Sequence, residues 1–193
     1  MTAPDLTTLL DEVWDAFEDA ARRAKHPLHV PTVATVRDGR PTLRSVVLQR
    51  VDRDAGTLGF NTDARGAKVA DLKANPAIAL HFYNPAAKVQ IRADAEATIH
   101  LDDAMADAAW TAVTPLGRRC YGQQPDPGSD ESVTRVTLPD VVLPDFDLLK
   151  DGDADTLSAI RKNFCAVQCR VISIDHLYLR YEGHRRARFD RTA

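Results

Sequence analysis

The fold is decided by residues 29–51, HVPTVATVRDGRPTLRSVVLQRV. Two runs rich in β-branched residues, 29–37 and 41–51, flank the dipeptide Asp38-Gly39. β-branched side chains suit a pleated strand, and Asp-Gly is favoured in the tight turn between two antiparallel strands. Residues 29–51 therefore predict a β-hairpin.

Beyond the hairpin, further short apolar runs are separated by glycine, proline, asparagine and aspartate, which are turn residues. They predict strands over 57–62, 77–83 and 88–100, and two or three more over 164–174, 177–181 and about 185–189. Short helices are expected between them, over 64–74, 103–113 and 154–162. Because these strands do not alternate regularly with long helices, we expect an antiparallel barrel, mainly β with short helices.

Before the hairpin, residues 5–25 predict an amphipathic helix that ends ahead of Pro27. Its large apolar residues recur at intervals of three or four, which places them on one helical face. They include Leu6, Leu9, Leu10, Val13 and Phe17.

The composition is that of a single folded domain, residues 1–193, with 25 basic and 28 acidic side chains and a formal net charge of −3. A long, mostly irregular loop is expected over the proline- and glycine-rich residues 114–145. The mildly acidic total argues against nucleic-acid binding, and no stretch approaches the roughly 20 apolar residues of a membrane span. The N-terminal residues lack the apolar core of a signal peptide, so we expect a cytoplasmic protein.

Cysteine and histidine spacing predicts no metal site, because neither a C-x-x-C nor an H-x-x-x-H pair occurs. The three cysteines, Cys120, Cys165 and Cys169, are interpreted as buried, reduced thiols. The G-x-S-x-G motif of hydrolases and the G-x-G-x-x-G motif of dinucleotide sites are also missing. The sequence singles out no acid–base or nucleophilic catalytic residue.

The segment from Thr62 to Lys68, TDARGAK, suggests a phosphate site. A predicted strand ends at Thr62 and a helix begins shortly after it, where free backbone N–H groups suit an anion. Arg65 and Lys68 are three residues apart and share a helical face, while Gly66 permits close approach of the backbone. The alternative, which carries equal weight from this segment alone, is a surface helix with solvated charges.

Two predicted strands and the C-terminus carry further candidates. Arg44 shares a strand face with Val46 and Leu48, where a bound anion would offset the cost of burying its charge; a strand-end arginine reaching solvent is the alternative. Gln90 shares a face with Arg92 and can address a polar ring edge. The C-terminal Gly183-His-Arg-Arg-Ala-Arg188 is strongly basic in an acidic chain, which favours an anionic ligand over a solvated tail.

Together these segments resemble the pyridoxamine 5′-phosphate oxidase family, the FMN-binding split barrels. The resemblance runs from about residue 29 to residue 190. It rests on RSVVLQ at 44–49, FNT at 60–62, RGAK at 65–68, NP at 75–76, QIR at 90–92 and GHRR at 183–186. Each motif is weak alone, whereas their order and spacing are fairly specific. The fold that the resemblance implies is an antiparallel split β-barrel.

The resemblance also implies an FMN site. Flavin contacts would come from Arg44, Ser45, Val46, Val47, Leu48, Gln49, Asn61, Thr62 and Gln90, from Gln123 or Gln124, and from Arg186. Arg65 and Lys68 would hold the FMN phosphate. In this family the flavin lies between two subunits, so a homodimer is implied.

The resemblance is weaker in the substrate half of the site. Gln49 stands where the oxidase proper has a lysine that helps to hold the substrate phosphate. Candidates for a replacement are His184, Arg118 and Arg186. We therefore expect an FMN-dependent oxidoreductase with weak or no turnover of pyridoxamine phosphate; the alternative is a non-catalytic flavin- or haem-binding module.

Overall fold

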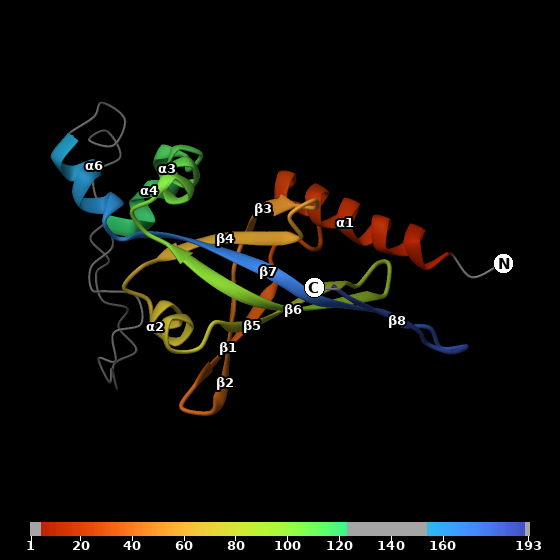
Figure 1. Cartoon of the computed structure of the whole chain (residues 1–193). Helices are drawn as coiled ribbons and strands as arrows, with labels where there is room; N and C mark the ends of the chain where they lie inside the picture. The colour runs from red at the N-terminus through yellow and green to blue at the C-terminus, as the bar shows by residue number, and fades with distance from the viewer. Residues whose placement is uncertain (1–4, 123–153, 192–193) are drawn as a thin grey trace, which may run out of the picture. The chain divides into compact units, whose positions relative to one another are not determined.

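The computed structural model describes residues 5–122 and 154–191. Strands predominate among these residues, and Figure 1 shows them with short helices between them. The strands are β1 (Thr32–Arg37), β2 (Arg40–Ser45), β3 (Leu48–Asp52), β4 (Thr57–Asp63), β5 (Ala77–Asn84), β6 (Val89–His100), β7 (Phe164–Tyr178) and β8 (Arg185–Asp190). The helices are α1 (Leu6–Arg22), α2 (Ala67–Ala74), α3 (Ala104–Thr111), α4 (Pro115–Arg118) and α6 (Ala154–Arg161), with a 3-10 helix η1 (Arg119–Gly122). The expectation of a mainly β protein with short helices is confirmed.

The strands form one eight-stranded sheet in the order β2-β1-β5-β6-β7-β4-β3, with β8 paired to β7. The predicted hairpin is β1–β2, with Thr32 opposite Ser45 and Arg37 opposite Arg40. Asp38 and Gly39 have positive φ angles of 51° and 73°, which a tight hairpin turn requires. Among the described residues, the path ends at β2 and β3, so the sheet is not closed into a continuous barrel.

The predicted strand over 41–51 is interrupted, because β2 ends at Ser45 and β3 begins at Leu48. The N–H groups of Val46 and Leu48 donate to the carbonyl oxygens of Pro31 and His29 at 3.0 and 2.9 Å. β2 pairs with β1, whereas β3 pairs with β4. Because of the break, one continuous apolar run of sequence contributes to two strand pairs, β1–β2 and β3–β4. The alternation of residues alone did not indicate this break.

Of the two or three strands expected at the C-terminus, the described residues form two, and the break expected between residues 174 and 177 is absent. A single strand, β7, runs from Phe164 to Tyr178, and its C-terminal part pairs with β8 from Ser173 opposite Asp190 to Tyr178 opposite Arg185. The polar pair Asp175-His176 had suggested a turn between two strands. In the structure, however, Asp175 is bound by arginines of the neighbouring strands, which satisfies its charge within the sheet.

The chain divides into two compact units. Unit 1 comprises residues 1–60, 75–98 and 168–193, and unit 2 comprises residues 61–74 and 99–167. No helix in the described parts of either unit is long and apolar enough to cross a membrane.

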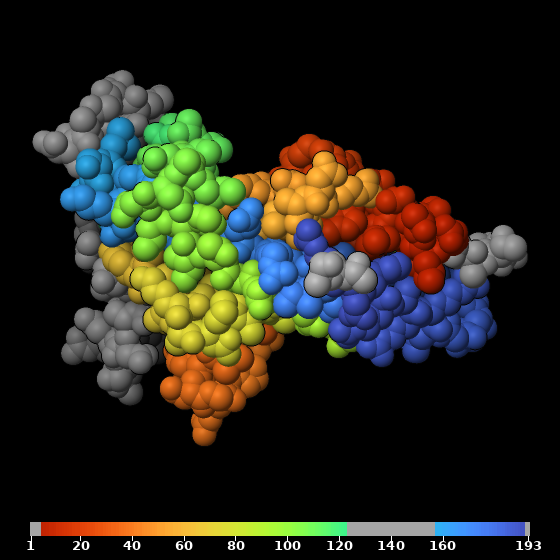
Figure 2. Space-filling view, in the orientation of Figure 1, coloured from red at the N-terminus to blue at the C-terminus, as the bar shows by residue number. Residues whose placement is uncertain are grey.

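In unit 1, α1 packs through the apolar face that its sequence predicts. Val13, Trp14, Phe17 and Ala20 are buried, and the Phe17 ring lies 4.7 Å from that of Phe82 on β5. Figure 2 shows the surface of α1 beside that of the C-terminal segment. Aromatic rings in such contact remove a large apolar area from water, which fixes the helix on the sheet.

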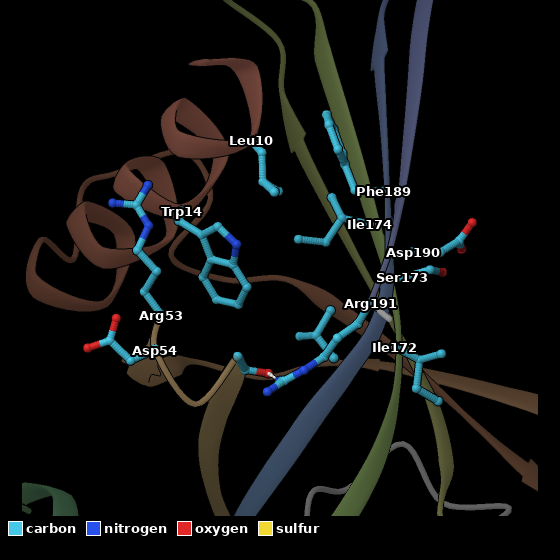
Figure 3. Close-up of a pocket in the computed structure, with 12 residues that line it drawn as sticks. Leu10, Trp14, Arg53, Asp54, Ile172, Ser173, Ile174, Phe189, Asp190 and Arg191 are labelled. Atoms are coloured by element: carbon cyan, nitrogen blue, oxygen red, sulfur yellow. Dashed lines mark hydrogen bonds between the residues drawn. The ribbon is translucent and has the colours of Figure 1, made fainter. Parts of the chain in front are cut away.

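A cleft of about 240 Å³ remains between α1 and the C-terminal strand. Figure 3 shows Leu10 and Trp14 of α1 pointing toward Ile174 and Phe189. Arg191 at its edge donates to the carbonyl oxygen of Ala55 at 2.5 Å. The cleft is smaller than the roughly 300–1,000 Å³ of typical cofactor pockets. We therefore interpret it as a gap in the packing of α1 on the sheet.

The core of unit 2 is aromatic. Trp110 of α3, Tyr121 of η1 and Phe164 of β7 pack edge to face, with centroid distances of 5.1–5.9 Å. Ala109 and Ala166 are buried against them. Part of the irregular loop expected over 114–145 is thus helical, because α4 and η1 occupy residues 115–122; the remainder lies outside the described residues.

Candidate functional site

The clearest site in unit 2 is a cradle formed by the end of β4 and the start of α2. The Nζ atom of Lys68, one of the two predicted phosphate ligands, donates to Oγ1 of Thr62 at 2.5 Å. Thr62 is buried and Lys68 is half-buried. A Cβ atom added to Gly66 would lie 3.1 Å from the Asp63 carbonyl oxygen and 3.8 Å from Lys68 Nζ. A side chain at position 66 would therefore crowd the turn and contact the lysine. We refer to residues 62–68 as the cradle.

Arg65 belongs to the same cradle but is held by a residue that the sequence analysis did not single out. Its Nε and Nη2 atoms donate to Oδ1 and Oδ2 of Asp63 at 2.9 and 2.6 Å. Only 18% of the Arg65 side chain and 9% of the Asp63 side chain are exposed. The pair has the two-pronged geometry that makes arginine–carboxylate contacts strong and directional.

The turn that joins β4 to α2 is also fixed from a distant part of the sequence. Asn163 accepts a hydrogen bond from the Ala64 N–H at 2.7 Å, and its Nδ2 donates to the Tyr121 carbonyl oxygen at 2.8 Å. The same carbonyl oxygen accepts from Arg65 Nη2 at 3.3 Å. The cradle is thereby tied to the aromatic core of unit 2, which limits its motion.

In unit 1, Arg44 finds partners that make a bound anion unnecessary for its charge. Its Nη1 donates to Thr35 Oγ1 at 2.7 Å, and its Nη2 donates to Thr42 Oγ1 at 2.9 Å. Thr35 is buried, with 1% exposed. Hydroxyl groups on the two strands of the hairpin therefore solvate the guanidinium.

The predicted flavin segment after Arg44 alternates in burial. Val46 and Leu48 have their side chains in the core, whereas Ser45, Val47 and Gln49 are exposed. Of this segment, only the second set has side chains available for a ligand. Asn61, in unit 2, is half-buried next to Thr62.

Gln90 and Arg186 lie in unit 1, on β6 and β8. Gln90 is half-buried opposite Tyr83. Arg186 is exposed, and its Nε and Nη2 atoms donate to the carboxylate of Asp175 at 3.0 and 2.5 Å. Arg92 Nη2 donates to the same carboxylate at 2.5 Å. We call Arg92, Asp175 and Arg186 the arginine clamp.

The arginine clamp has a clear electrostatic signature. Hydrogen bonds from Arg186, and then from Arg92, lower the pKa of the Asp175 carboxyl against the opposing effect of its burial. The pKa of Arg186 is raised by the same contact. At neutral pH this cluster is therefore fully charged, with two cations around one anion.

The predicted substrate residues lie apart in the chain and in different units. His184 is exposed just before β8. The Arg118 guanidinium lies 4.9 Å from the centroid of the Trp110 ring and donates to the Trp110 carbonyl oxygen at 3.3 Å. Gln123 and Gln124 lie outside the described residues. Cys165 and Cys169 are buried as expected, but Cys120 is exposed.

Unit 1 also has a wide groove of about 970 Å³. Its lining is largely apolar and comes from α1 and the adjoining ends of β6, β7 and β8, with Leu6, Val89 and Tyr178 among the residues. Of the predicted cofactor residues, Arg186 is the one that lines it. His176 is also there, half-buried, and burial lowers its pKa, which keeps its imidazole neutral at pH 7.

Comparison with known proteins agrees with the arrangement of these motifs. Residues 17–142, more than half of the chain, match the family model described as pyridoxamine 5′-phosphate oxidase. The chain belongs to the pyridoxamine 5′-phosphate oxidase family. The resemblance that the sequence motifs indicated is thus confirmed.

Curated relatives in this family are pyridoxine/pyridoxamine 5′-phosphate oxidases. One from Pseudomonas paraeruginosa (strain DSM 24068 / PA7) is 36% identical over 106 residues, 53% of this chain and 47% of the relative. One from Pseudomonas putida (strain GB-1) is 34% identical over 120 residues, 61% of this chain and 53% of the relative. The chain thus spans about half the length of the curated relatives it matches.

Two solved structures show that the fold is that of the FMN-binding split barrels. A pyridoxamine 5′-phosphate oxidase-related, FMN-binding protein from Nostoc punctiforme PCC 73102 superposes with a TM-score of 0.69 at 22% identity, covering 100% of this chain and 94% of that protein. PhzG from Burkholderia lata 383, solved with tetrahydrophenazine-1-carboxylic acid, gives a TM-score of 0.66 at 20% identity, covering 98% and 88%. The expected split-barrel class is confirmed.

Sequence reasoning missed three residues that shape the sites of this family member. Asp63 was visible in TDARGAK as an acid two residues before an arginine, a spacing that a turn can bring together. Asn163 and Asp175 gave no such signal, because their partners lie 42 and 83 residues away in the chain. Only the folded chain reveals these contacts.

Proposed function

We propose that this protein binds FMN through the cradle and acts as an FMN-dependent oxidoreductase. The observation that carries the proposal is the convergence of Thr62 and Lys68 beside Gly66, at the N-terminus of α2. A hydroxyl, an ammonium group and the N–H groups that open a helix form a suitable set of donors for a phosphate. The family membership and the split-barrel fold support the same ligand.

The residues present suit one terminal phosphate better than a dinucleotide. A side chain at position 66 would crowd the Asp63 carbonyl oxygen and reach Lys68 Nζ. Bound FMN would supply hydride and electron transfer through its flavin ring, which leaves binding and orientation to the protein. Thr62 and Lys68 would hold the phosphate, and Arg65 would add charge from the same turn.

The first test is a titration of the purified chain with FMN, FAD and riboflavin. We expect FMN to bind most tightly, with a changed flavin absorption spectrum and a raised melting temperature, because ligand binding to the folded state stabilises it. Saturating FMN that leaves both spectrum and melting temperature unchanged would contradict the proposal.

Turnover separates an oxidoreductase from a module that only holds flavin. An enzyme bleaches its flavin when substrate is added anaerobically and recovers the colour in air, whereas a binding module retains FMN without this cycle. The physiological substrate would show itself in such a screen. Pyridoxamine phosphate is the first compound to include, because the curated relatives are named for it.

We expect turnover of pyridoxamine phosphate to be weak or absent. Gln49, which stands at the lysine position of the oxidase proper, is exposed at the start of β3 and carries no charge. Charge-assisted hydrogen bonds are roughly twice as strong as neutral ones, so the substrate phosphate loses affinity here. Peroxide release at micromolar pyridoxamine phosphate measures this, and efficient turnover would show that other cations replace the lysine.

We also propose a homodimer. Its support beyond the family is a set of exposed large apolar side chains on unit 1, whose burial by a second copy would remove apolar area from water. They include Leu43, Val47, Tyr83 and Ile172, which are 38–65% exposed. Sedimentation should give twice the chain mass of 21.3 kDa. A monomer that still binds FMN tightly would disprove the dimer without affecting the cradle.

A further inference from the structure

Asp63 is the last residue of β4, and its carboxylate is committed almost entirely to Arg65. Oδ1 accepts from the Arg65 backbone N–H and from Nε, both at 2.9 Å, and Oδ2 accepts from Nη2 at 2.6 Å. One buried carboxylate thus receives three hydrogen bonds from one residue. A carboxylate beside a phosphate site would repel the phosphate and weaken its binding. The presence of Asp63 in the cradle therefore indicates that the residue has another function.

The contacts determine the orientation of the Arg65 guanidinium. The planar group presents two N–H edges, and Asp63 takes the edge formed by Nε and Nη2. Nη2 is also within 3.3 Å of the Tyr121 carbonyl oxygen, a third fixed point. Because the group is planar, these contacts fix the direction of Nη1 as well. An arginine ordered in advance loses less rotamer freedom when a ligand binds.

The backbone of Asp63 also shapes the turn. Its carbonyl oxygen accepts from the Gly66 N–H at 3.1 Å, while its side chain accepts from the Arg65 N–H. These two bonds bend the chain from β4 into α2. They place Gly66 where an added Cβ atom would approach Lys68.

From these contacts, and on the basis of the proposed FMN function, we infer that Asp63 is a positioning residue for the cofactor phosphate. It acts through Arg65, by holding the guanidinium and the turn in the geometry that the phosphate requires. The inference has a consequence of definite sign. Removing the negative charge of Asp63 should weaken FMN binding, although simple electrostatics predicts that it should strengthen binding.

The test compares FMN and riboflavin, which lacks the phosphate. Asp63→Asn keeps the size of the side chain but replaces the charged hydrogen bonds to Arg65 by neutral ones. We expect FMN affinity to fall about tenfold, a typical effect of one lost charge-assisted hydrogen bond, with riboflavin affinity unchanged. In an Arg65→Ala background, Asp63→Asn should cause no further loss, because Asp63 acts through Arg65.

Two further variants guard against a folding defect. Arg65→Lys keeps the positive charge but lacks the planar guanidinium. It should therefore also lower FMN affinity about tenfold and leave riboflavin affinity unchanged. Asp103→Asn is the matched control in unit 2, because Asp103 caps α3 by accepting from the Ala106 N–H at 2.9 Å and belongs to no part of the cradle. It should lower the melting temperature without changing the preference for FMN.

The possible outcomes are distinct. Tighter FMN binding by Asp63→Asn would show that the carboxylate only repels the phosphate and would overturn the inference. Equal losses for FMN and riboflavin, or full FMN affinity in Arg65→Lys, would overturn it as well. If the unmodified protein does not prefer FMN to riboflavin, the proposed function itself fails. If that preference exists and Lys68→Ala abolishes it while Asp63→Asn leaves it unchanged, only the role of Asp63 is wrong.

Discussion

The cradle in unit 2 and the arginine clamp in unit 1 both contain an arginine–carboxylate ion pair but differ in geometry and in their other groups. In the cradle, Arg65 pairs with a carboxylate two residues away, and Lys68 and Thr62 meet beside a glycine. In the clamp, Arg92 and Arg186 come from two strands and converge on a single carboxylate of a third strand, Asp175. A local pair shapes a turn, whereas the long-range pair cross-links a sheet.

The difference shows why basic residues alone do not define an anion site. Arg65, Lys68 and Arg186 were all predicted as cofactor contacts from the sequence. The carboxylate of the clamp is shared by two guanidinium groups, while the cradle adds an ammonium and a hydroxyl beside a glycine at a helix start. We expect a phosphate to bind the cradle, where donors of several kinds lie in one short segment of the chain.

The largest effect should come from Lys68. Lys68→Ala, and separately Arg65→Ala, should each cost roughly 1.5–3 kcal/mol in FMN binding, the range for hydrogen bonds to charged groups, or about ten- to 150-fold in affinity. Riboflavin should be almost insensitive to both. Titration by flavin fluorescence measures the dissociation constants. Equal losses for both ligands would mean that the helix is only structural, and the contrast with the clamp would disappear.

A smaller effect is expected from Gly66→Ala. The new Cβ atom would lie 3.1 Å from the Asp63 carbonyl oxygen, closer than ordinary van der Waals contact, and would face Lys68 Nζ. Crowding of this kind costs about 1 kcal/mol at the lower end of its range, which is about fivefold in FMN affinity. Isothermal titration should show the loss. Unchanged FMN binding together with a raised melting temperature would place the phosphate elsewhere.

Asp175→Asn tests the clamp as a stabilising element. The pKa of Asp175 is lower in the folded protein than in the unfolded chain, where it is about 3.9. The ionised carboxylate therefore stabilises the fold fully above the unfolded-state pKa. This contribution disappears as the pH falls through the folded-state pKa. Both arginines are at least half exposed, so we expect at most about 1 kcal/mol at pH 7. Urea unfolding should show that the variant is less stable at pH 7 and that the difference shrinks as the pH is lowered below about 3.9. A constant difference across this range would exclude the carboxylate as its cause.

The smallest effect is expected for Arg186→Ala on phosphate recognition. Because Asp175 holds this guanidinium, the ratio of FMN to riboflavin affinity should not change, even if both affinities fall through a contact with the flavin ring. A selective loss of FMN affinity would assign Arg186 to the phosphate. The clamp would then be a ligand site like the cradle.

Much of the fold followed from local sequence patterns. The β1–β2 hairpin was readable from Asp38-Gly39 between β-branched runs, and α1 from its apolar spacing. The break after Ser45 and the unbroken β7 were not, because both depend on which strand pairs with which. The contact of Lys68 with Thr62 was also foreseeable, since both residues lie in one short segment of the chain.

The sequence by itself determined most of the elements, the family motifs and the composition of the cradle, because residues a few positions apart can meet where a strand turns into a helix. Only the tertiary structure decided which charges are committed to carboxylates. Arg92 and Arg186 donate to Asp175 from 83 and 11 residues away in the chain. The Asn163 carbonyl oxygen fixes the cradle turn by accepting from the Ala64 N–H, 99 residues away. Such contacts depend on strand register and on packing between distant segments, which no local pattern encodes.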